Sequence, residues 1–143
     1  MAVSKSDLEK YASVTTDKLR YCDADSQGHV NNAVFSTFLE TGRTELFIHE
    51  KLNLFTKTSG FALANLNMDF LRPVFWPGEV QIYTGIARIG GSSLELQQLV
   101  VQNNEIAASA KTTMVQIDLT TNKAKKFTDD IREELSNYLL PAA

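Results

Sequence analysis

The residues best suited to chemistry lie in the stretch YCDADSQGHVNN, residues 21–32. Asp25 comes three residues before Gly28 and just ahead of a predicted helix that starts near Asn32. The positive end of the helix dipole favours an ionised carboxylate there, and such an acid acts as a nucleophile or a general base. Unpaired backbone N–H groups at the same helix end can donate to an oxyanion. The stretch is therefore either an elaborate turn or a site in which an ionised Asp25 lies beside amide donors.

The same residue types also have structural roles. Asp is common in turns and ahead of helices, and a lone histidine such as His29 usually forms hydrogen bonds within a turn. Asn31 or Asn32 can cap the helix, because a short side-chain carbonyl accepts a hydrogen bond from a first-turn amide. Cys22 is the only cysteine, so the chain has no internal disulfide and no cysteine-based zinc site.

Apolar spacing and turn residues divide the chain into strands and helices. Helical spacing from Phe35 to Leu46 predicts one long helix, roughly residues 32–51. Strands are predicted at 13–21, 61–71, 79–89, 93–102 and 105–118, and a short closing helix at 128–140. The segments between the strands contain Gly, Pro or Asn, as turns do.

One long helix ahead of a run of antiparallel strands predicts an α+β domain whose sheet wraps the apolar face of the helix. The strands at 79–89 and 93–102 are joined by a short Gly-Gly turn and form the clearest hairpin. A small open sheet has an edge that is best protected by pairing across a twofold axis. We therefore expect a homodimer at least.

The overall composition limits the classes of function. A chain of 143 residues suits a single domain, residues 1–143, and a net charge of -3 offers no basic surface for nucleic acid. No apolar run is long enough to cross a bilayer, and the N-terminus MAVSKSDLEK is too polar for a secretory signal. We expect a cytoplasmic protein that binds neither nucleic acid nor membrane.

Three stretches carry a family resemblance: residues 23–43 (DADSQGHVNNAVFSTFLETGR), 67–80 (NMDFLRPVFWPGEV) and 108–118 (ASAKTTMVQID). Together they resemble the hotdog-fold acyl-CoA thioesterases of the 4-hydroxybenzoyl-CoA thioesterase type. The resemblance implies a central helix wrapped by a five- or six-stranded antiparallel sheet. It also implies dimers that often pair as tetramers, with active sites at the dimer interface. The implied reaction is hydrolysis of an acyl-CoA to free acid and CoA, with no metal and no cofactor beyond the CoA of the substrate.

Residue by residue, the resemblance assigns the catalytic acid to Asp25. One branch of the family pairs this acid with a tyrosine four residues earlier and a histidine seven residues later; this chain has Tyr21 and Asn32 at those positions. Asn32 cannot titrate, so it would orient water or substrate. The expected substrate-binding residues are Tyr21, His29, Asn31 and Asn32. Glu40 corresponds to a general base on the helix in some relatives and would act across the dimer interface, but it also fits a surface or interface pair with Arg43 or Thr44.

Relatives often place basic and polar residues near the phosphates of CoA, and Arg88, Ser92 and Ser93 occupy such positions here. A thioester on an acyl-carrier protein would suit the same catalytic groups. The missing histidine also favours an alternative, a hotdog protein that binds an acyl group or acyl-CoA without turnover. A dehydratase or hydratase fits poorly, because such enzymes need a His and Asp pair elsewhere in the fold and this chain has only His29 and His49.

Overall fold

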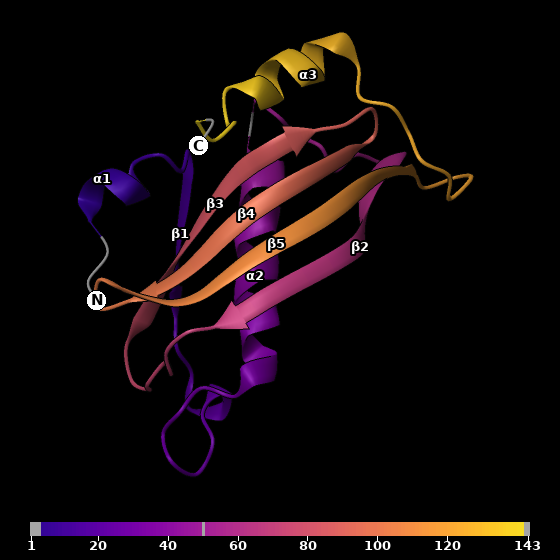
Figure 1. Cartoon of the computed structure of the whole chain (residues 1–143). Coiled ribbons are helices and arrows are strands. Elements are labelled where there is room, and N and C mark those ends of the chain that lie inside the picture. The colour runs from indigo at the N-terminus through magenta and orange to yellow at the C-terminus, as the bar shows by residue number, and fades with distance from the viewer. Residues whose placement is uncertain (1–3, 50, 142–143) are drawn as a thin grey trace.

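The structure is a computed structural model that describes residues 4–49 and 51–141 (Figure 1). Its elements, in chain order, are α1 (Lys5–Leu8), β1 (Ser13–Lys18), a short 3-10 helix (Tyr21–Asp23), α2 (Asn32–Phe47), β2 (Ser59–Phe70), β3 (Glu79–Ile89), β4 (Ser93–Gln102), β5 (Glu105–Asp118) and α3 (Asp129–Ser136). The five predicted strands and both predicted helices are present. The short α1 was not predicted.

The long helix ends earlier than predicted. It stops at Phe47 with Ile48 as its C-cap, whereas the sequence pattern suggested an end near Lys51. The chain turns back after the cap, because the N–H groups of Leu52 and Asn53 both donate to the carbonyl of His49. Asn53 then adopts a positive φ of 41°, a conformation that a continuing helix does not allow.

The five strands form one antiparallel sheet in the order β1-β3-β4-β5-β2. One face of the sheet carries α2, which crosses it and packs against β1, β3 and β4 (Figure 1). The arrangement confirms the predicted α+β hotdog architecture, with five strands rather than six.

Two contacts fix α2 on the sheet. Gly42 allows the helix backbone to approach closely, because a Cβ atom there would lie 2.6 Å from the Cγ2 of Ile82. Beside it, the buried amide of Gln98 donates to the carbonyl of Leu39 at 3.0 Å and to the hydroxyl of Thr84 at 3.0 Å. The position of the helix, and so of its N-terminus, is therefore set by tight packing and a buried polar contact.

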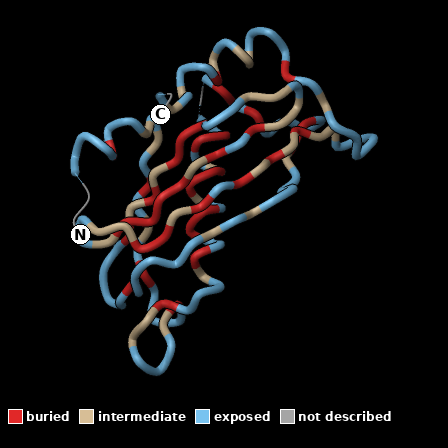
Figure 2. Tube along the Cα trace, viewed as in Figure 1, coloured by how far each residue is buried: buried red, intermediate tan, exposed pale blue. Residues whose placement is uncertain are grey.

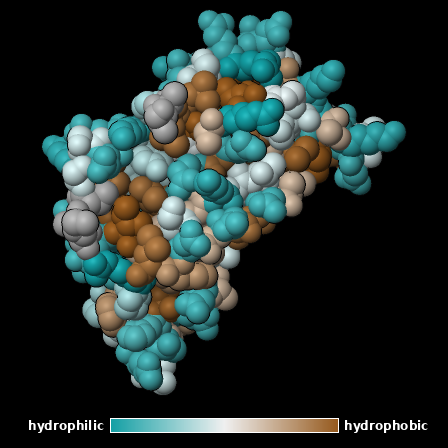
Figure 3. Space-filling model, in the orientation of Figure 1, coloured by the Kyte–Doolittle hydropathy of each residue, from teal (hydrophilic) through white to brown (hydrophobic). Residues whose placement is uncertain are grey.

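The opposite face of the sheet is covered only in part. Leu8 of α1 packs there with Leu99 and Val101, and the segment after α3 places Leu140 against Gly85 of β3. In Figure 3 this face shows apolar atoms in separate patches, with hydrophilic atoms between them. The sheet therefore directs its more continuous apolar surface toward α2.

The edge strand β2 differs from the inner strands β3 and β4 in burial. Figure 2 shows it as largely exposed, while β3 and β4 are largely buried. Leu63 and Phe70 on this strand are 49% and 50% exposed. Exposed apolar side chains on a strand with one unpaired edge are unusual in a monomer and typical of an interface.

In the part of the chain that the structure describes, no helix is long and apolar enough to cross a membrane. The cytoplasmic location stays a prediction.

Candidate active site

The predicted site begins with a tight turn between the 3-10 helix and α2. The N–H of Asp25 donates to the carbonyl of His29 at 2.8 Å, and the N–H of Gly28 donates back to the carbonyl of Asp25 at 3.1 Å. Gly28 has a φ of +79°, which a residue with a Cβ atom adopts only at a cost. The glycine at this position is thus required by the shape of the turn.

Main-chain hydrogen bonds attach this turn to the rest of the molecule. The N–H of Val30 donates to the carbonyl of Val74 at 2.8 Å, and the N–H of Trp76 donates to the carbonyl of Gly28 at 3.1 Å. The N–H of Asn31 donates to the carbonyl of Asp23 at 2.9 Å. The segment before β3 therefore holds the turn in place from one side, and the 3-10 helix holds it from the other.

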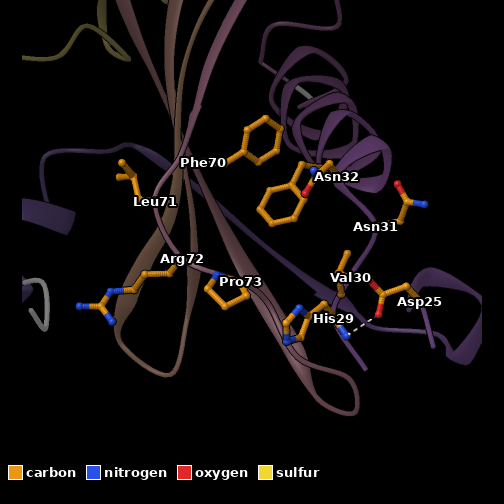
Figure 4. Close-up of a pocket in the computed structure, with 10 residues that line it drawn as sticks. Asp25, His29, Val30, Asn31, Asn32, Phe70, Leu71, Arg72 and Pro73 are labelled. Carbon is orange, nitrogen blue, oxygen red and sulfur yellow. Dashed lines mark hydrogen bonds between the residues drawn. The ribbon is translucent and has the colours of Figure 1, made fainter. Parts of the chain in front are cut away.

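The carboxylate of Asp25 is oriented by the turn itself. Its Oδ1 accepts hydrogen bonds from the N–H of Gln27 at 2.8 Å and of His29 at 3.1 Å, and the second of these is drawn in Figure 4. Its Oδ2 accepts no hydrogen bond from residues 4–49 or 51–141, and the side chain is exposed. One oxygen is thus fixed while the other remains free to attack a carbonyl or to accept a proton from water.

The start of α2 supplies a hydrogen-bond donor beside this acid. Asn31 is the N-cap, as predicted, and its side chain accepts from the N–H of Ala33 at 3.0 Å. Its carbonyl accepts from the N–H of Val34 at 2.9 Å. Asn32 follows the cap directly and precedes Ala33 and Val34. Its backbone N–H has no acceptor within the described ranges. This free amide at the positive end of the helix is suited to stabilise an oxyanion.

A cavity of about 490 Å³ brings these groups together. From the turn and α2 it is lined by Asp25, His29, Val30, Asn31, Asn32 and Phe35, and from the end of β2 by Phe70, Leu71, Arg72 and Pro73. In Figure 4 the ring of Phe70 points toward the start of α2, and Arg72 points away from it. Arg72 forms an ion pair with Glu105 at 2.8 Å. The cavity thus has a polar end at Asp25 and an apolar wall at Phe70.

The four residues from β2 and the segment after it were missed as site residues in the sequence analysis. Only the antiparallel register of β2 and the crossing of α2 bring Phe70 to the helix start, where its ring lies 5.2 Å from that of Phe35. Phe70 to Pro73 are part of a stretch used for the family resemblance, and the apolar pair before a basic residue and a proline was the available signal.

His29 lines the cavity but is held at its rim, where its ring makes an edge contact with Phe75 at 4.8 Å. Tyr21 does not line the cavity. It is 78% exposed at the start of the 3-10 helix and contacts Trp76 edge-on at 5.1 Å. The structure therefore groups Asp25, His29, Asn31 and Asn32, and it places Tyr21 beside the turn.

The residues predicted for CoA lie far from this cavity within one chain. Val115 of β5 pairs with Ser93 of β4 on one side and with Ala62 of β2 on the other, so Ser93 and Ala62 lie at the same level of the sheet. Ala62 lies eight residues before Phe70 on β2. At about 3.3 Å per residue the separation is roughly 26 Å. Arg88, which is mainly exposed, lies within 4.0 Å of Glu95, and Ser92 and Ser93 are half-buried at the hairpin.

Glu40 also lies outside this cavity. It is exposed on α2 and lines a second, smaller cavity of about 220 Å³ with Arg43, Phe61 and Leu63. No group of three or more His, Cys, Asp or Glu side chains in the described ranges is arranged to hold a metal ion.

The model of the thioesterase-like superfamily matches residues 19–135. The chain belongs to this superfamily. The match includes the turn, α2 and all strands after it, so the family and the enzyme class expected from the three stretches are confirmed: the chain is a hotdog thioesterase. The roles of single residues at the site remain predictions.

Named relatives of this thioesterase agree with that assignment. The long-chain acyl-CoA thioesterase FadM of Escherichia coli strain K12 is 31% identical over 129 residues, which cover 87% of this chain and 98% of FadM. A predicted thioesterase from Bacillus stearothermophilus has a TM-score of 0.82 and 26% identity, and covers 92% of this chain and 98% of its own. A thioesterase from Thermus thermophilus, solved with coenzyme A and Zn, has a TM-score of 0.74 and 28% identity, and covers 87% and 98%.

Proposed function

We propose that this thioesterase hydrolyses acyl-CoA thioesters in the cavity at the start of α2, with the carboxylate of Asp25 as the general base or the nucleophile. The observation that carries the proposal is that one cavity is lined by both Asp25, whose Oδ2 is free, and Asn32, whose backbone N–H has no acceptor in the described ranges. Its likeness to FadM, whose name states a long-chain acyl-CoA substrate, supports the thioester class. The CoA-bound relative from Thermus thermophilus supports CoA as the carrier.

In this mechanism the thioester carbonyl oxygen accepts a hydrogen bond from the backbone N–H of Asn32, and negative charge develops on that oxygen during attack. Asp25 either accepts a proton from an attacking water or attacks the carbonyl carbon itself. In the second case an acyl-aspartyl anhydride forms, which water then hydrolyses. In both cases the carbon–sulfur bond breaks, CoA leaves as the thiolate, and the products are free acid and CoA. The chain and water supply every group that this route uses, so it requires no cofactor.

The cavity walls suit an acyl group with an apolar part. Phe35, Phe70 and Leu71 contribute apolar surface to the cavity that Asp25 also lines. Apolar walls with few polar groups are typical of small-molecule sites in which the polar groups fix the orientation of the ligand. We propose that the acyl chain lies against these side chains while its carbonyl meets Asp25 and the Asn32 amide.

We further propose that the enzyme is a homodimer joined through β2. The unpaired edge and the exposed apolar side chains of β2 support such an interface. Antiparallel pairing of two β2 strands would bring the Arg88 hairpin of one subunit to the same end of the joined sheet as the cavity of the other. In that position Arg88, Ser92 and Ser93 of the second subunit would contact the phosphates of CoA. A dimer of dimers stays a prediction from the family.

A thiol-release assay over a panel of acyl-CoAs tests the proposed function. Asp25→Asn should lower the rate for the best substrate by about 10²–10⁴-fold, because it removes the acid but keeps the side-chain shape. The matched control is Asp130→Asn, an exposed acid on α3, which should keep the wild-type rate.

Equal rates for Asp25→Asn and the wild type would overturn the assignment of Asp25. If the wild type binds an acyl-CoA but releases no thiol from any of them, or from acyl-carrier-protein thioesters, the binding-module alternative replaces hydrolysis. That alternative is motivated by Asn32, which occupies the position of a titratable histidine in one branch of the family.

A further inference from the structure

A buried arginine on α2 lacks a partner in the single chain. Arg43 is only 6% exposed, and its Nη1 is buried without an acceptor in the described ranges. Burial lowers the pKa of its guanidinium, and the negative charge of Glu40 acts in the opposite direction. A buried donor without an acceptor is costly, and a charged one more so. The guanidinium can still contact a group from outside the chain where Arg43 lines the cavity of about 220 Å³.

Glu40 is an acidic residue close to Arg43 that forms no ion pair with it within one chain. It lies three residues before Arg43, is exposed, and lines the same small cavity. Within one chain the two side chains form no ion pair of 4.0 Å or less, since Arg43 takes part in none of those found across the described residues. An unpaired cation and an unpaired anion thus lie side by side on one helix face.

This face of α2 borders the unpaired edge of the sheet. Phe61 and Leu63 of β2 line the small cavity together with Phe47 of α2. The ring of Phe35 lies 5.2 Å from that of Phe70, and the ring of Phe47 lies 4.5 Å from that of Phe61. The start of α2 therefore contacts the end of β2, and the end of α2 contacts the beginning of β2, so the helix and the strand run in opposite directions.

These two ring contacts set the level of Glu40 and Arg43 along β2. Halfway between Phe35 and Phe47, the helix reaches residue 41. Halfway between Phe61 and Phe70, the strand lies between Asn65 and Leu66, within about one residue of the centre of β2 (Ser59–Phe70). Glu40 and Arg43 therefore stand on either side of the level at which a twofold axis through the centre of β2 would pass.

We propose that Glu40 of each subunit forms an ion pair with Arg43 of the second copy across this twofold axis. The inference rests on the homodimer proposed above and adds the residues that recognise the partner. A twofold axis perpendicular to the sheet pairs the β2 strands antiparallel, keeps both α2 helices on one face and runs them in opposite directions. Glu40 of one helix then faces Arg43 of the other, twice over.

The same operation makes each active site a shared structure. It brings the Phe70 end of one β2 beside the Phe61 end of the other, so the small cavity of one subunit adjoins the Asp25 cavity of its partner. In the dimer, the ion pairs between Glu40 and Arg43 would lie between the small cavity of one subunit and the Asp25 cavity of the other. In this arrangement Glu40 is a positioning residue that fixes the two helices, and it does not serve as the general base.

Co-expression of two charge-reversed chains with different affinity tags tests the pairing. One chain carries Glu40→Arg and the other Arg43→Glu, so each homodimer has like charges at both contacts, whereas the heterodimer restores two opposite-charge contacts. Relative to co-expressed wild-type chains, the ratio of heterodimer to homodimers should rise roughly tenfold or more. Like charges within each helix remain in the heterodimer, so a pair confined to one helix gives no such preference. The double variant Glu40→Arg/Arg43→Glu should again form homodimers.

A statistical mixture of dimers would overturn the proposal, as would a monomeric wild type in analytical ultracentrifugation. If the charge-reversed chains fail to fold, a second pair of chains decides: Glu40→Cys and Arg43→Cys, each on a Cys22→Ser background. A short bismaleimide should join the thiol at position 40 of one chain to the thiol at position 43 of the other, and absence of this product contradicts the pairing. Thiol release by the wild type is measured separately, so loss of the pairing and loss of the proposed activity are distinguishable.

Discussion

Replacing Gly42 with alanine tests whether the close contact between α2 and the sheet sets the stability of the fold. In an exposed helix this change would stabilise by about 1 kcal/mol, because glycine is the poorer helix former. Here the added Cβ would lie 2.6 Å from Ile82 Cγ2, 3.0 Å from Thr84 Oγ1 and 3.1 Å from Gln98 Nε2. The β-branched Ile82 is stiff at χ1, and the other two groups are tied by a hydrogen bond, so none of the three moves freely.

Overpacking of this kind costs about 1–3 kcal/mol, and with three fixed neighbours we expect the upper part of that range. After the gain in helix propensity, Gly42→Ala should lower the free energy of unfolding by about 1–2 kcal/mol and Tm by roughly 3–7 °C. Urea and thermal denaturation followed by circular dichroism measure both. Thr37→Ala, at an exposed position on the same helix, should be neutral or slightly stabilising. If both variants gain stability alike, the close contact is not limiting and the reasoning fails.

Three further changes probe the turn, the helix cap and a surface carboxylate. Gly28→Ala should destabilise by about 1–2 kcal/mol, and Gly28→Asn by less, because a positive φ costs asparagine less and the space around the position is open; equal losses in urea denaturation would contradict this. Asn31→Ala should lower the free energy of unfolding by about 0.5–2 kcal/mol and also slow thiol release, since it removes the cap that orders the start of α2. An unchanged rate of thiol release would show that the cap does not contribute to activity. Hydrogen bonds from the N–H groups of Thr120 and Thr121 hold the pKa of Asp118 below its usual 3.8. The stabilisation is therefore present above pH 3.8 and is lost as the pH falls through the lower folded-state pKa. Asp118→Asn should thus lower Tm at neutral pH and approach the wild type in more acidic buffer, and a constant difference down to about pH 2 would refute it.

The strands and the turn at Asp25 could be predicted from the sequence because their signals are local. Gly-Gly at 90–91 and Asn-Asn at 103–104 mark the ends of β3, β4 and β5, and both asparagines take the positive φ that such turns require. Asp25, Gly28 and Asn31 also act within a few residues of one another, so their spacing alone indicates the turn and the cap. The end of α2 depended instead on hydrogen bonds to His49 in the turn that follows, which apolar periodicity does not reveal.

The remaining features depend on contacts between distant parts of the chain. Phe70 reaches the cavity only through the crossing of α2 over the sheet, and Arg43 is buried where it lines the small cavity with Phe61 and Leu63 of β2. From spacing alone, Glu40 and Arg43 fit a surface pair equally well, because the sequence does not show which helix face is covered. The short α1 was missed for a similar reason, since Leu8 is its only apolar residue and is buried by the sheet.

The turn that holds Asp25 has a consequence for how this enzyme can diverge. The hydrogen bonds that orient the carboxylate come from the main chain, so the exposed side chains of Ser26 and Gln27 contribute nothing to its geometry. Any residue except proline keeps the N–H that position 27 donates. These two positions can therefore vary in size and charge at the rim of the cavity while the acid stays in place. A library restricted to them would search for new substrate preferences while keeping the geometry proposed for Asp25.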